Sequence, residues 1–218
     1  MEESKHLSSL MADLKMYRDF ITGWWKYRKR MKRGDVWIQK YAQAKGLRPN
    51  PHAMFYTNLK IWIEESRDLY GRQQCPCFEP SGDEGLDMKL LCPCAFAPAD
   101  VEARGVCHCV LFGRGDLTDA EFAAAEKELQ REYRPGLNLI GNRLDTRGQP
   151  LDPSRGLPVP DATHQVKQAL NAVAGDLVVV VDREASVANL QKMAASRGYG
   201  FDSREASPGV HEVTLKRS

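Results

Sequence analysis

The sequence predicts an α+β protein in which an N-terminal all-α domain is followed by a small two-layer domain of strands and helices. In residues 1–134, apolar side chains recur mostly at helical spacing. Residues 134–160 contain five prolines and four glycines, which is typical of a domain boundary or a long loop. Beyond this stretch, short β-branched runs alternate with helical patterns. We therefore assign residues 1–134 to the first domain and residues 135–218 to the second.

The first domain begins with an amphipathic helix, predicted for residues 5–33. Its apolar positions keep the i, i+3, i+4, i+7 spacing of one helix face. They are Leu7, Leu10, Met11, Leu14, Tyr17, Ile21 and Trp25. Gly34 should end this helix, and Asp35 can cap a short second helix that reaches Gly46.

Two further helices frame the cysteine motifs of the first domain. The helix before the motifs begins with Asn50 as its cap and Pro51 at its first helical position, and it ends by Gly71. After the motifs, Thr118 and Glu121 form a capping box that opens another helix. The cysteines are therefore expected in loops between helices.

The second domain has the pattern of a small α+β unit. A buried strand is predicted where four valines follow a leucine, and Gly198 should close the helix after it. The predicted elements are helices at residues 161–173 and 186–196 and strands at residues 177–181, 199–204 and 210–215.

All six cysteines lie in the first domain, in three Cys-x-Cys pairs. The pairs are Cys75-Pro-Cys77, Cys92-Pro-Cys94 and Cys107-His-Cys109. Such a pair does not readily close on itself, because a disulfide needs Cα atoms about 4.4 to 6.8 Å apart with converging Cβ vectors. The prolines favour extended backbone, in which side chains two residues apart leave the same side of the chain. Each pair therefore offers two sulfurs to one place.

The expected compartment decides how these thiols are used. The chain opens with Glu2 and Glu3 and has no long apolar run, so we expect a soluble cytoplasmic protein without a membrane segment. In a reducing compartment, clustered cysteines are ligands or catalysts rather than structural disulfides.

Two kinds of metal site compete for the six thiols. Structural zinc sites usually take Cys-x2-4-Cys knuckles, and four zinc ligands would leave two cysteines without a role. A [4Fe-4S] cluster also takes four thiolates, but the remaining two would form a dithiol beside an electron store. We favour the iron-sulfur cluster with a dithiol and keep a zinc-binding structural or adaptor protein as the alternative.

The stretch from Tyr41 to Asp116 contains YAQAKG, CPC, CPC and CHCVLF in that order. It resembles the catalytic subunit of ferredoxin-thioredoxin reductase and its ferredoxin-disulfide reductase relatives, over residues 35–116. The spacings between the pairs differ a little from the plant-type pattern. The resemblance implies an oxidoreductase whose [4Fe-4S] cluster passes electrons from ferredoxin, one at a time, to a redox-active disulfide. That disulfide would reduce thioredoxin or a thioredoxin-like protein.

The resemblance also implies a role for each cysteine. The implied cluster ligands are Cys75, Cys92, Cys94 and Cys107. Cys77 and Cys109 would form the redox-active disulfide, with Cys77 as the exposed nucleophile and Cys109 beside the cluster. His108 stands between a ligand and a redox cysteine, and an ordinary histidine pKa of about 6.5 would suit proton transfer there. We therefore expect Cys77, Cys109 and His108 to be catalytic.

A basic cluster lies near the end of the first predicted helix. It consists of Lys26, Arg28, Lys29, Arg30, Lys32 and Arg33. A solvated helix end explains it slightly better than a surface for an acidic partner such as ferredoxin. The whole chain carries only +2 and has no nucleic-acid-binding motif, which argues against nucleic acid as a partner.

The second domain resembles the TusA-like sulfur-carrier family, which implies a βαβαββ order. The resemblance is carried by RGLPVPDATHQVKQAL from Arg155, by VVVVDREASVANLQKMAASRGYGF and by HEVTLKRS. Where that family has its Cys-Pro motif, this chain has Val159 before Pro160, and Ala162 replaces the second proline. Without the thiol the domain cannot carry sulfur. We favour a module kept for packing or docking over one that recruits sulfur-trafficking proteins.

Overall fold

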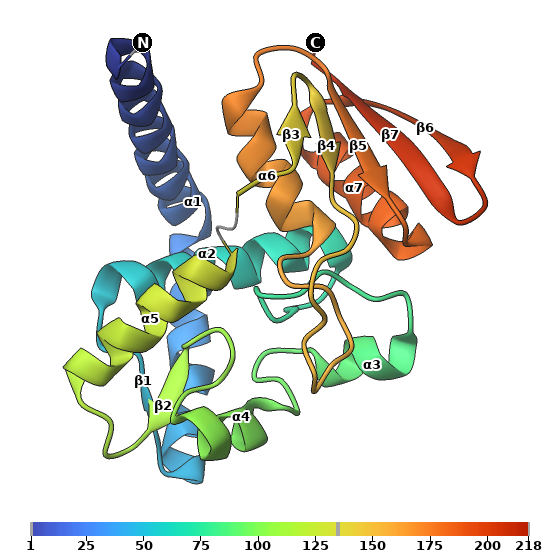
Figure 1. Cartoon of the computed structure of the whole chain (residues 1–218). Coiled ribbons are helices and arrows are strands. Elements are labelled where there is room, and N and C mark those ends of the chain that lie inside the picture. Colours follow the sequence, from blue (N-terminus) through green and yellow to red (C-terminus); the bar gives the residue numbers. More distant parts are fainter. Residues whose placement is uncertain (1, 134–135, 218) are drawn as a thin grey trace.

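The computed structural model describes residues 2–133 and 136–217, with side chains in the first helix described from residue 17 onward. It combines a helical N-terminal part with a small C-terminal sheet domain (Figure 1). The expected boundary at residues 134–135 lies outside the described residues. So do the side chains of four apolar positions in the first predicted helix, Leu7, Leu10, Met11 and Leu14.

The helical part holds five helices and a two-stranded sheet within the described residues. The helices are α1 (Glu2–Lys45), α2 (Ala53–Tyr70), α3 (Glu84–Lys89), α4 (Ala97–Arg104) and α5 (Asp119–Tyr133). Strands β1 (Leu47–Pro49) and β2 (Phe112–Arg114) pair in antiparallel fashion. This pairing ties the chain after α1 to the loop of the third cysteine pair. The short helices α3 and α4 were not predicted.

Helix α1 is continuous through Gly34, so the expected stop at that residue is wrong. Met31 and Ile38, on either side of the glycine, are buried. Burying each of them is worth about 1.5 to 3 kcal/mol, more than the roughly 1 kcal/mol that a glycine costs inside a helix. Gly23 lets α1 approach α2 closely, because a Cβ there would lie 2.8 Å from Ile61 Cγ2.

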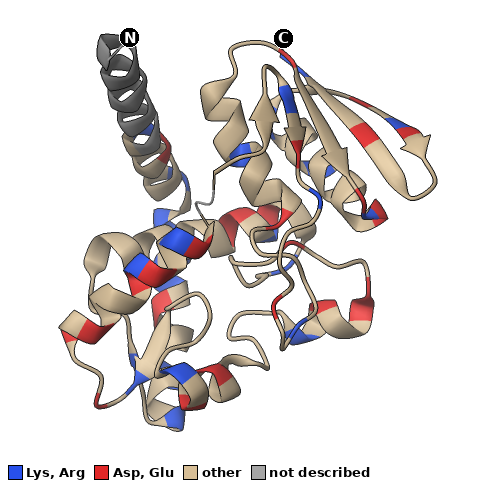
Figure 2. Ribbon diagram, viewed as in Figure 1, with Lys and Arg blue, Asp and Glu red and all other residues tan. Residues whose placement is uncertain are grey.

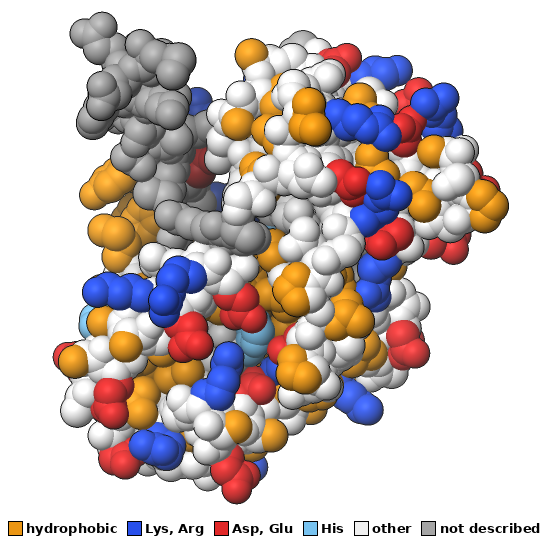
Figure 3. Space-filling model, in the orientation of Figure 1, with side chains coloured by type: hydrophobic (Ala, Val, Ile, Leu, Met, Phe, Trp, Pro, Cys, Tyr) orange, Lys and Arg blue, Asp and Glu red, His pale blue; other side chains and the backbone are white. Residues whose placement is uncertain are grey.

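Part of the basic cluster of α1 is paired with α2. Lys26 Nζ lies 3.0 Å and Arg30 Nη1 2.8 Å from the carboxylate oxygens of Asp68. Close by on α1, several large apolar side chains are exposed, and orange side chains are visible beside this helix in Figure 3. They are Tyr17, Ile21, Trp24 and Trp25. These exposed positions include residues that the amphipathic pattern assigned to a buried face.

Two further predicted helix boundaries of the helical part are confirmed, and one is wrong. Gly71 ends α2 in the left-handed conformation, as expected. The Thr118–Glu121 capping box is confirmed, with Thr118 N donating to Glu121 Oε2 at 2.7 Å. Asn50 is not the cap of α2, which begins at Ala53. Its side chain instead donates to the Val110 carbonyl at 3.0 Å.

The C-terminal domain is a five-stranded sheet with two helices against one face (Figure 1). Its elements are β3 (Leu139–Ile140), β4 (Arg143–Asp145), α6 (Ala162–Ala172), β5 (Leu177–Val181), α7 (Glu184–Arg197), β6 (Gly200–Ser207) and β7 (Val210–Lys216). The strand order is β3-β4-β5-β7-β6, and among these neighbours β4 and β5 run parallel. The predicted helices and strands from residue 161 onward are confirmed within a few residues. The first strand of the expected βαβαββ order had no predicted residue range, and β3 was not predicted.

Residues 146–161, here called the interdomain loop, leave the sheet after β4 and extend into the helical part (Figure 1). The loop is held by its own backbone, with Asp152 N donating to Leu157 O at 2.8 Å and Val159 N to Pro150 O at 2.9 Å. Leu157 and Val159 belong to the buried cluster that contains the cysteines. A segment assigned to the second domain therefore completes the core of the first.

Charges of both signs are interspersed along both parts of the molecule (Figure 2). This agrees with a formal net charge of +2. In that view no large region of the molecule carries charges of one sign alone. None of the helices in the described ranges combines the length and apolar character that a membrane span needs.

Candidate redox site

The first two cysteine loops are joined by backbone hydrogen bonds. Cys75 N donates to Leu90 O at 2.7 Å, and Cys92 N donates to Gln73 O at 2.8 Å. The first loop follows α2, and the second connects α3 to α4. The two Cys-Pro-Cys motifs therefore lie side by side, although a whole helix separates them in the sequence.

The third cysteine loop is a tight turn between α4 and β2. Cys107 N donates to Phe112 O at 2.9 Å, and Val110 N donates to Cys107 O at 2.8 Å. The turn requires a φ of 58° at Val110, a conformation that a β-branched residue seldom adopts. The Asn50 side chain holds this strained residue by its carbonyl, and Phe112 N lies 3.3 Å from Cys107 Sγ. The turn therefore fixes the Cys107 sulfur and the backbone that follows Cys109.

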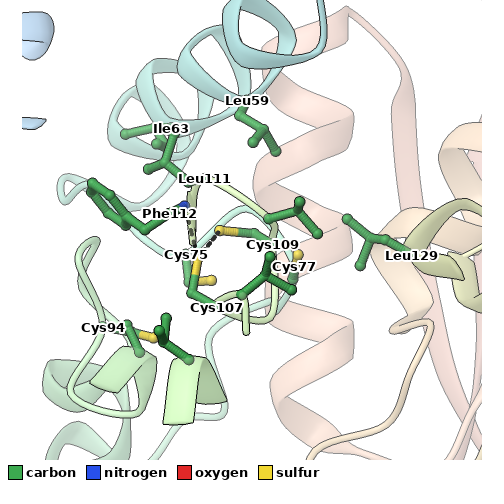
Figure 4. Close-up of a cluster of buried hydrophobic side chains, with 14 of the residues drawn as sticks. Leu59, Ile63, Cys75, Cys77, Cys94, Cys107, Cys109, Leu111, Phe112 and Leu129 are labelled. Atoms are coloured by element: carbon green, nitrogen blue, oxygen red, sulfur yellow. Dashed lines mark hydrogen bonds between the residues drawn. The ribbon is translucent and has the colours of Figure 1, made fainter. Parts of the chain in front are cut away.

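The three loops bring their sulfurs together beneath α2, below Leu59 and Ile63 (Figure 4). All six cysteines are free. The sulfurs of Cys75, Cys77 and Cys109 lie within 4.8 Å of one another, and all three side chains are buried. Cys107 Sγ lies 3.8 Å from Cys109 Sγ.

Five of the six cysteines line one small cavity. They are Cys75, Cys92, Cys94, Cys107 and Cys109, and Pro93, Ala97, His108 and Phe112 complete the wall. All four expected cluster ligands thus face a common space together with Cys109. Cys77 does not line this cavity, and its side chain is only 3% exposed. The expectation that Cys77 is exposed is therefore wrong.

The thiols differ in their tendency to ionise. Hydrogen bonds from Cys109, Cys77 and Cys94 hold the pKa of Cys75 well below its ordinary value. Burial raises the pKa of Cys77 and of Cys92 well above the ordinary value. Of these three thiols, Cys75 therefore ionises most readily.

His108 is buried between the cysteines and the end of α5. Its Nε2 lies 3.2 Å from the Tyr133 hydroxyl, and its Nδ1 lies 3.5 Å from Asp152 Oδ2. The Tyr133 hydroxyl also donates to the Cys77 carbonyl at 2.5 Å. Burial lowers the pKa of His108 to about 4, so the imidazole is neutral at pH 7. The expectation of an ordinary pKa is wrong for this residue.

Arg155, on the interdomain loop, brings a buried positive charge to the cysteines. Its Nη2 donates to Asp100 Oδ2 at 2.5 Å and lies 3.8 Å from Cys94 Sγ. The guanidinium also lies over the rings of Phe78 and Phe96, 5.0 and 4.6 Å from their centres. Neither Arg155 nor Asp100 was predicted as part of the site, because a lone arginine in a proline-rich loop has no pattern typical of a site.

The donor set fits a thiolate-bound metal group. Thiolates are the ligands that iron-sulfur clusters and zinc prefer. The Cys75, Cys77 and Cys109 trio could hold a metal, and Cys92, Cys94 and Cys107 supply further sulfurs around the cavity. The walls of that cavity are otherwise mostly apolar, which suits a buried cluster more than an exposed ion.

Comparison with known proteins supports the same chemistry. No curated protein matches the chain. A family model described as the ferredoxin thioredoxin reductase catalytic beta chain matches residues 26–134, half of the 218 positions. The match begins inside α1 and ends after α5, so the family region is wider than the expected 35–116. Members of this family are iron-sulfur disulfide oxidoreductases that work with ferredoxin and thioredoxin. The chain belongs to the ferredoxin thioredoxin reductase catalytic beta chain family.

Proposed function

We propose that this protein is a ferredoxin-dependent disulfide reductase that reduces thioredoxin or a thioredoxin-like protein. The observation that carries the proposal is the meeting of the three Cys-x-Cys pairs, with five cysteines around one cavity and Cys77 beside two of them. Six free thiols also fit a reducing compartment, and we propose the cytoplasm.

The proposed cluster ligands are the four cysteines expected from the sequence. Cys75, Cys92, Cys94 and Cys107 all line the cavity, which supports this set. Once bound there, a [4Fe-4S] cluster would supply electrons singly to the neighbouring disulfide. The closest sulfur trio contains only Cys75 from this set, and the other two sulfurs belong to the proposed dithiol. The dithiol therefore lies directly beside a ligand.

The dithiol of Cys77 and Cys109 is proposed to perform the exchange. The Cys77 thiolate attacks one sulfur of the acceptor disulfide, which forms a mixed disulfide and releases one acceptor thiolate. The Cys109 thiolate then attacks the Cys77 sulfur, which releases the second acceptor thiolate and leaves a Cys77–Cys109 disulfide. The acceptor gains two electrons and two protons, and two electrons from ferredoxin together with two protons restore the dithiol.

His108 is proposed to handle protons during this exchange. Burial lowers the pKa of His108 to about 4, and the negative charge of Cys75 acts in the opposite direction, so the imidazole would hold an accepted proton only while a neighbouring thiolate is charged. Nε2 lies against the Tyr133 hydroxyl, which in turn donates to the Cys77 carbonyl. His108 and Tyr133 thus link the proton-accepting group to the loop of the nucleophile.

The C-terminal domain is proposed to be TusA-like in fold but not in chemistry. Its β4-α6-β5-α7-β6-β7 succession supports the βαβαββ order expected from the resemblance. Val159 occupies the place of the carrier cysteine, so sulfur chemistry is confined to residues 75–109. We propose a docking or packing role for this domain.

Anaerobic purification tests the proposed function. The protein should be brown, with broad absorption near about 400 nm and roughly four irons per chain. Reduced ferredoxin should then open the Cys77–Cys109 disulfide, as measured by thiol counting. The buried cysteine trio would also suit zinc in an adaptor protein. A colourless protein that holds zinc would establish that alternative and end the reductase proposal.

A further inference from the structure

Cys77 cannot reach a folded partner in the conformation described above. Thiol exchange requires the attacking sulfur to contact a sulfur of the acceptor. The Cys77 side chain is 3% exposed, and a disulfide on a folded protein cannot enter a closed core. Some part of the molecule must therefore move before a protein disulfide can be reduced.

The residues next to Cys77 in the chain contact the C-terminal domain. Phe78 lies against the guanidinium of Arg155. Glu79 N donates to Asp161 Oδ2 at 2.7 Å, and the Pro80 carbonyl accepts from Asn189 Nδ2 at 2.8 Å.

The other side of Cys77 faces the same domain. Pro76 lines a pocket together with Asp161 and Thr163 at the start of α6. The C-terminal domain therefore borders the loop on both sides of Cys77, and it is called the cover below.

The centre of this interface combines buried polar groups with apolar ones. The Glu79 carboxyl accepts hydrogen bonds from the hydroxyls of Thr163 and Ser186, each at 2.5 Å. Leu157 and Val159 of the interdomain loop join the buried cluster that contains Cys77. Polar contacts of this kind fix the position of a domain but also separate more readily than an extended apolar interface.

The edge of the interface is an ion-pair cluster on α2. Glu65 accepts from Lys167 on α6 and from Arg197 on α7, each at 3.2 Å. These side chains are partly exposed, so each pair contributes only about 0 to 1 kcal/mol.

We propose that the C-terminal domain occupies the surface on which the acceptor protein docks, so that Cys77 reaches a protein disulfide only while this domain is displaced. The inference depends on the proposed function for the role of Cys77. The domain now on that surface also indicates which partner fits it. An acceptor should present an apolar loop to Phe78, a helix start with hydrogen-bonding groups to Glu79 and basic side chains to Glu65.

Charge reversal at the edge of the interface tests the proposal in the full chain. Lys167→Glu with Arg197→Glu places two carboxylates against Glu65 and should loosen the cover without touching a cysteine. Adding Glu65→Lys restores opposite charges and is the matched control. An independent variant, Ser186→Ala with Asn189→Ala, removes two hydrogen bonds from α7 to the loop after Cys77.

Two measurements are made on pre-reduced protein. The first is the rate at which iodoacetamide alkylates Cys77, located by mass spectrometry, and the second is the single-turnover reduction of oxidised thioredoxin.

We expect both rates to rise about threefold or more in the loosened variants, given the weak ion pairs that hold the edge. The triple charge swap should return both rates toward the wild-type values. Unchanged Cys77 alkylation in both loosened variants would overturn the proposal. Faster alkylation with slower thioredoxin reduction would also overturn it, because the domain would then be part of the docking platform.

Failure of the proposed function has a different signature. In that case no low-potential donor would open the Cys77–Cys109 disulfide in any variant. The alkylation pattern would still report whether the C-terminal domain covers Cys77, because iodoacetamide needs neither a cluster nor a donor.

Discussion

The helical part and the sheet domain organise their residues in opposite ways. In the helical part, the chemistry lies in three loops held by hydrogen bonds between distant segments, such as Cys75 N to Leu90 O. In the sheet domain, the core follows a regular alternation, with Leu177, Val179 and Val181 all packed toward the helices. The first part carries every cysteine, and the second carries none.

The difference shows that a domain without a reactive group can still shape a reactive site. The interdomain loop supplies Arg155 and Asp152, which contact Asp100 and His108 beside the cysteines. It also supplies apolar side chains to the cysteine core. The helical part therefore provides the sulfurs, and the sheet domain provides part of their enclosure and charge.

The largest expected effect separates two cysteines within the helical part. Cys92→Ser should lose iron and the absorption near about 400 nm, because it removes a proposed ligand. Cys77→Ser should keep both and lose disulfide reduction, because it removes only the nucleophile. Iron content and thioredoxin reduction measure these outcomes. An iron-free Cys77→Ser protein would instead assign Cys77 to the ligand set.

A second test removes the charge that the sheet domain contributes to the site. Arg155→Ala leaves the buried carboxylates of Asp100 and Asp152 without their cation, which should lower the free energy of unfolding by about 3 to 5 kcal/mol. Urea unfolding measures the change. Arg147→Ala, which removes a surface pair with Asp145, is the matched control and should change little. Equal losses of unfolding free energy in the two variants would show that the buried ion pairs of Arg155 stabilise the protein no more than the surface pair of Arg147.

A third test uses pH at the interface between the two parts. Burial, with a smaller contribution from Asp161, raises the pKa of Glu79 from 4.5 to about 7. The folded protein therefore favours the neutral carboxyl of Glu79. The contribution of this carboxyl to the free energy of unfolding is fully present below pH 4.5 and is lost as the pH rises through 7. Between pH 5 and 8, the free energy of unfolding should fall by about 1 to 3 kcal/mol more than in Glu79→Gln. If the free energy of unfolding changed with pH in the same way in the wild-type protein and in Glu79→Gln, Glu79 would not be the source of the pH dependence.

The smallest effect concerns a helix end away from the interface. Thr118→Ala removes the side-chain acceptor for Glu121 N and should cost about 1 kcal/mol. Thr118→Ser should keep most of that stability. Neither change should alter the alkylation rate of Cys77, since the capping bonds join Thr118 to Glu121 and involve no residue of the C-terminal domain. Thermal unfolding and alkylation together check this, and a faster alkylation rate would show coupling between α5 and the cover.

Local signals in the sequence predicted much of the fold. Gly71, the Thr118–Glu121 box and the valine strand at residues 177–181 each depend on neighbours a few residues away. The continuity of α1 depends instead on its packing against α2, which outweighs the propensity of Gly34. The elements with local causes were therefore predictable, and those set by tertiary contacts were not.

The candidate site shows the same division. The cysteine pairs and their likeness to a known family indicated the chemistry, and their meeting in one place follows the prediction. The burial of Cys77 and the neutral state of His108 depend on segments far away in sequence. Tyr133 and the interdomain loop enclose both residues, and no spacing within the cysteine motifs could reveal that.

The packing of Leu157 and Val159 into the cysteine core has a consequence for how this gene can change. A shortened chain that ended near residue 134 would expose apolar surface around the redox cysteines to water and to other proteins. Deletion of the coding region beyond residue 134 would therefore carry an aggregation cost. The C-terminal domain is therefore costly to lose, even though it has no thiol of its own.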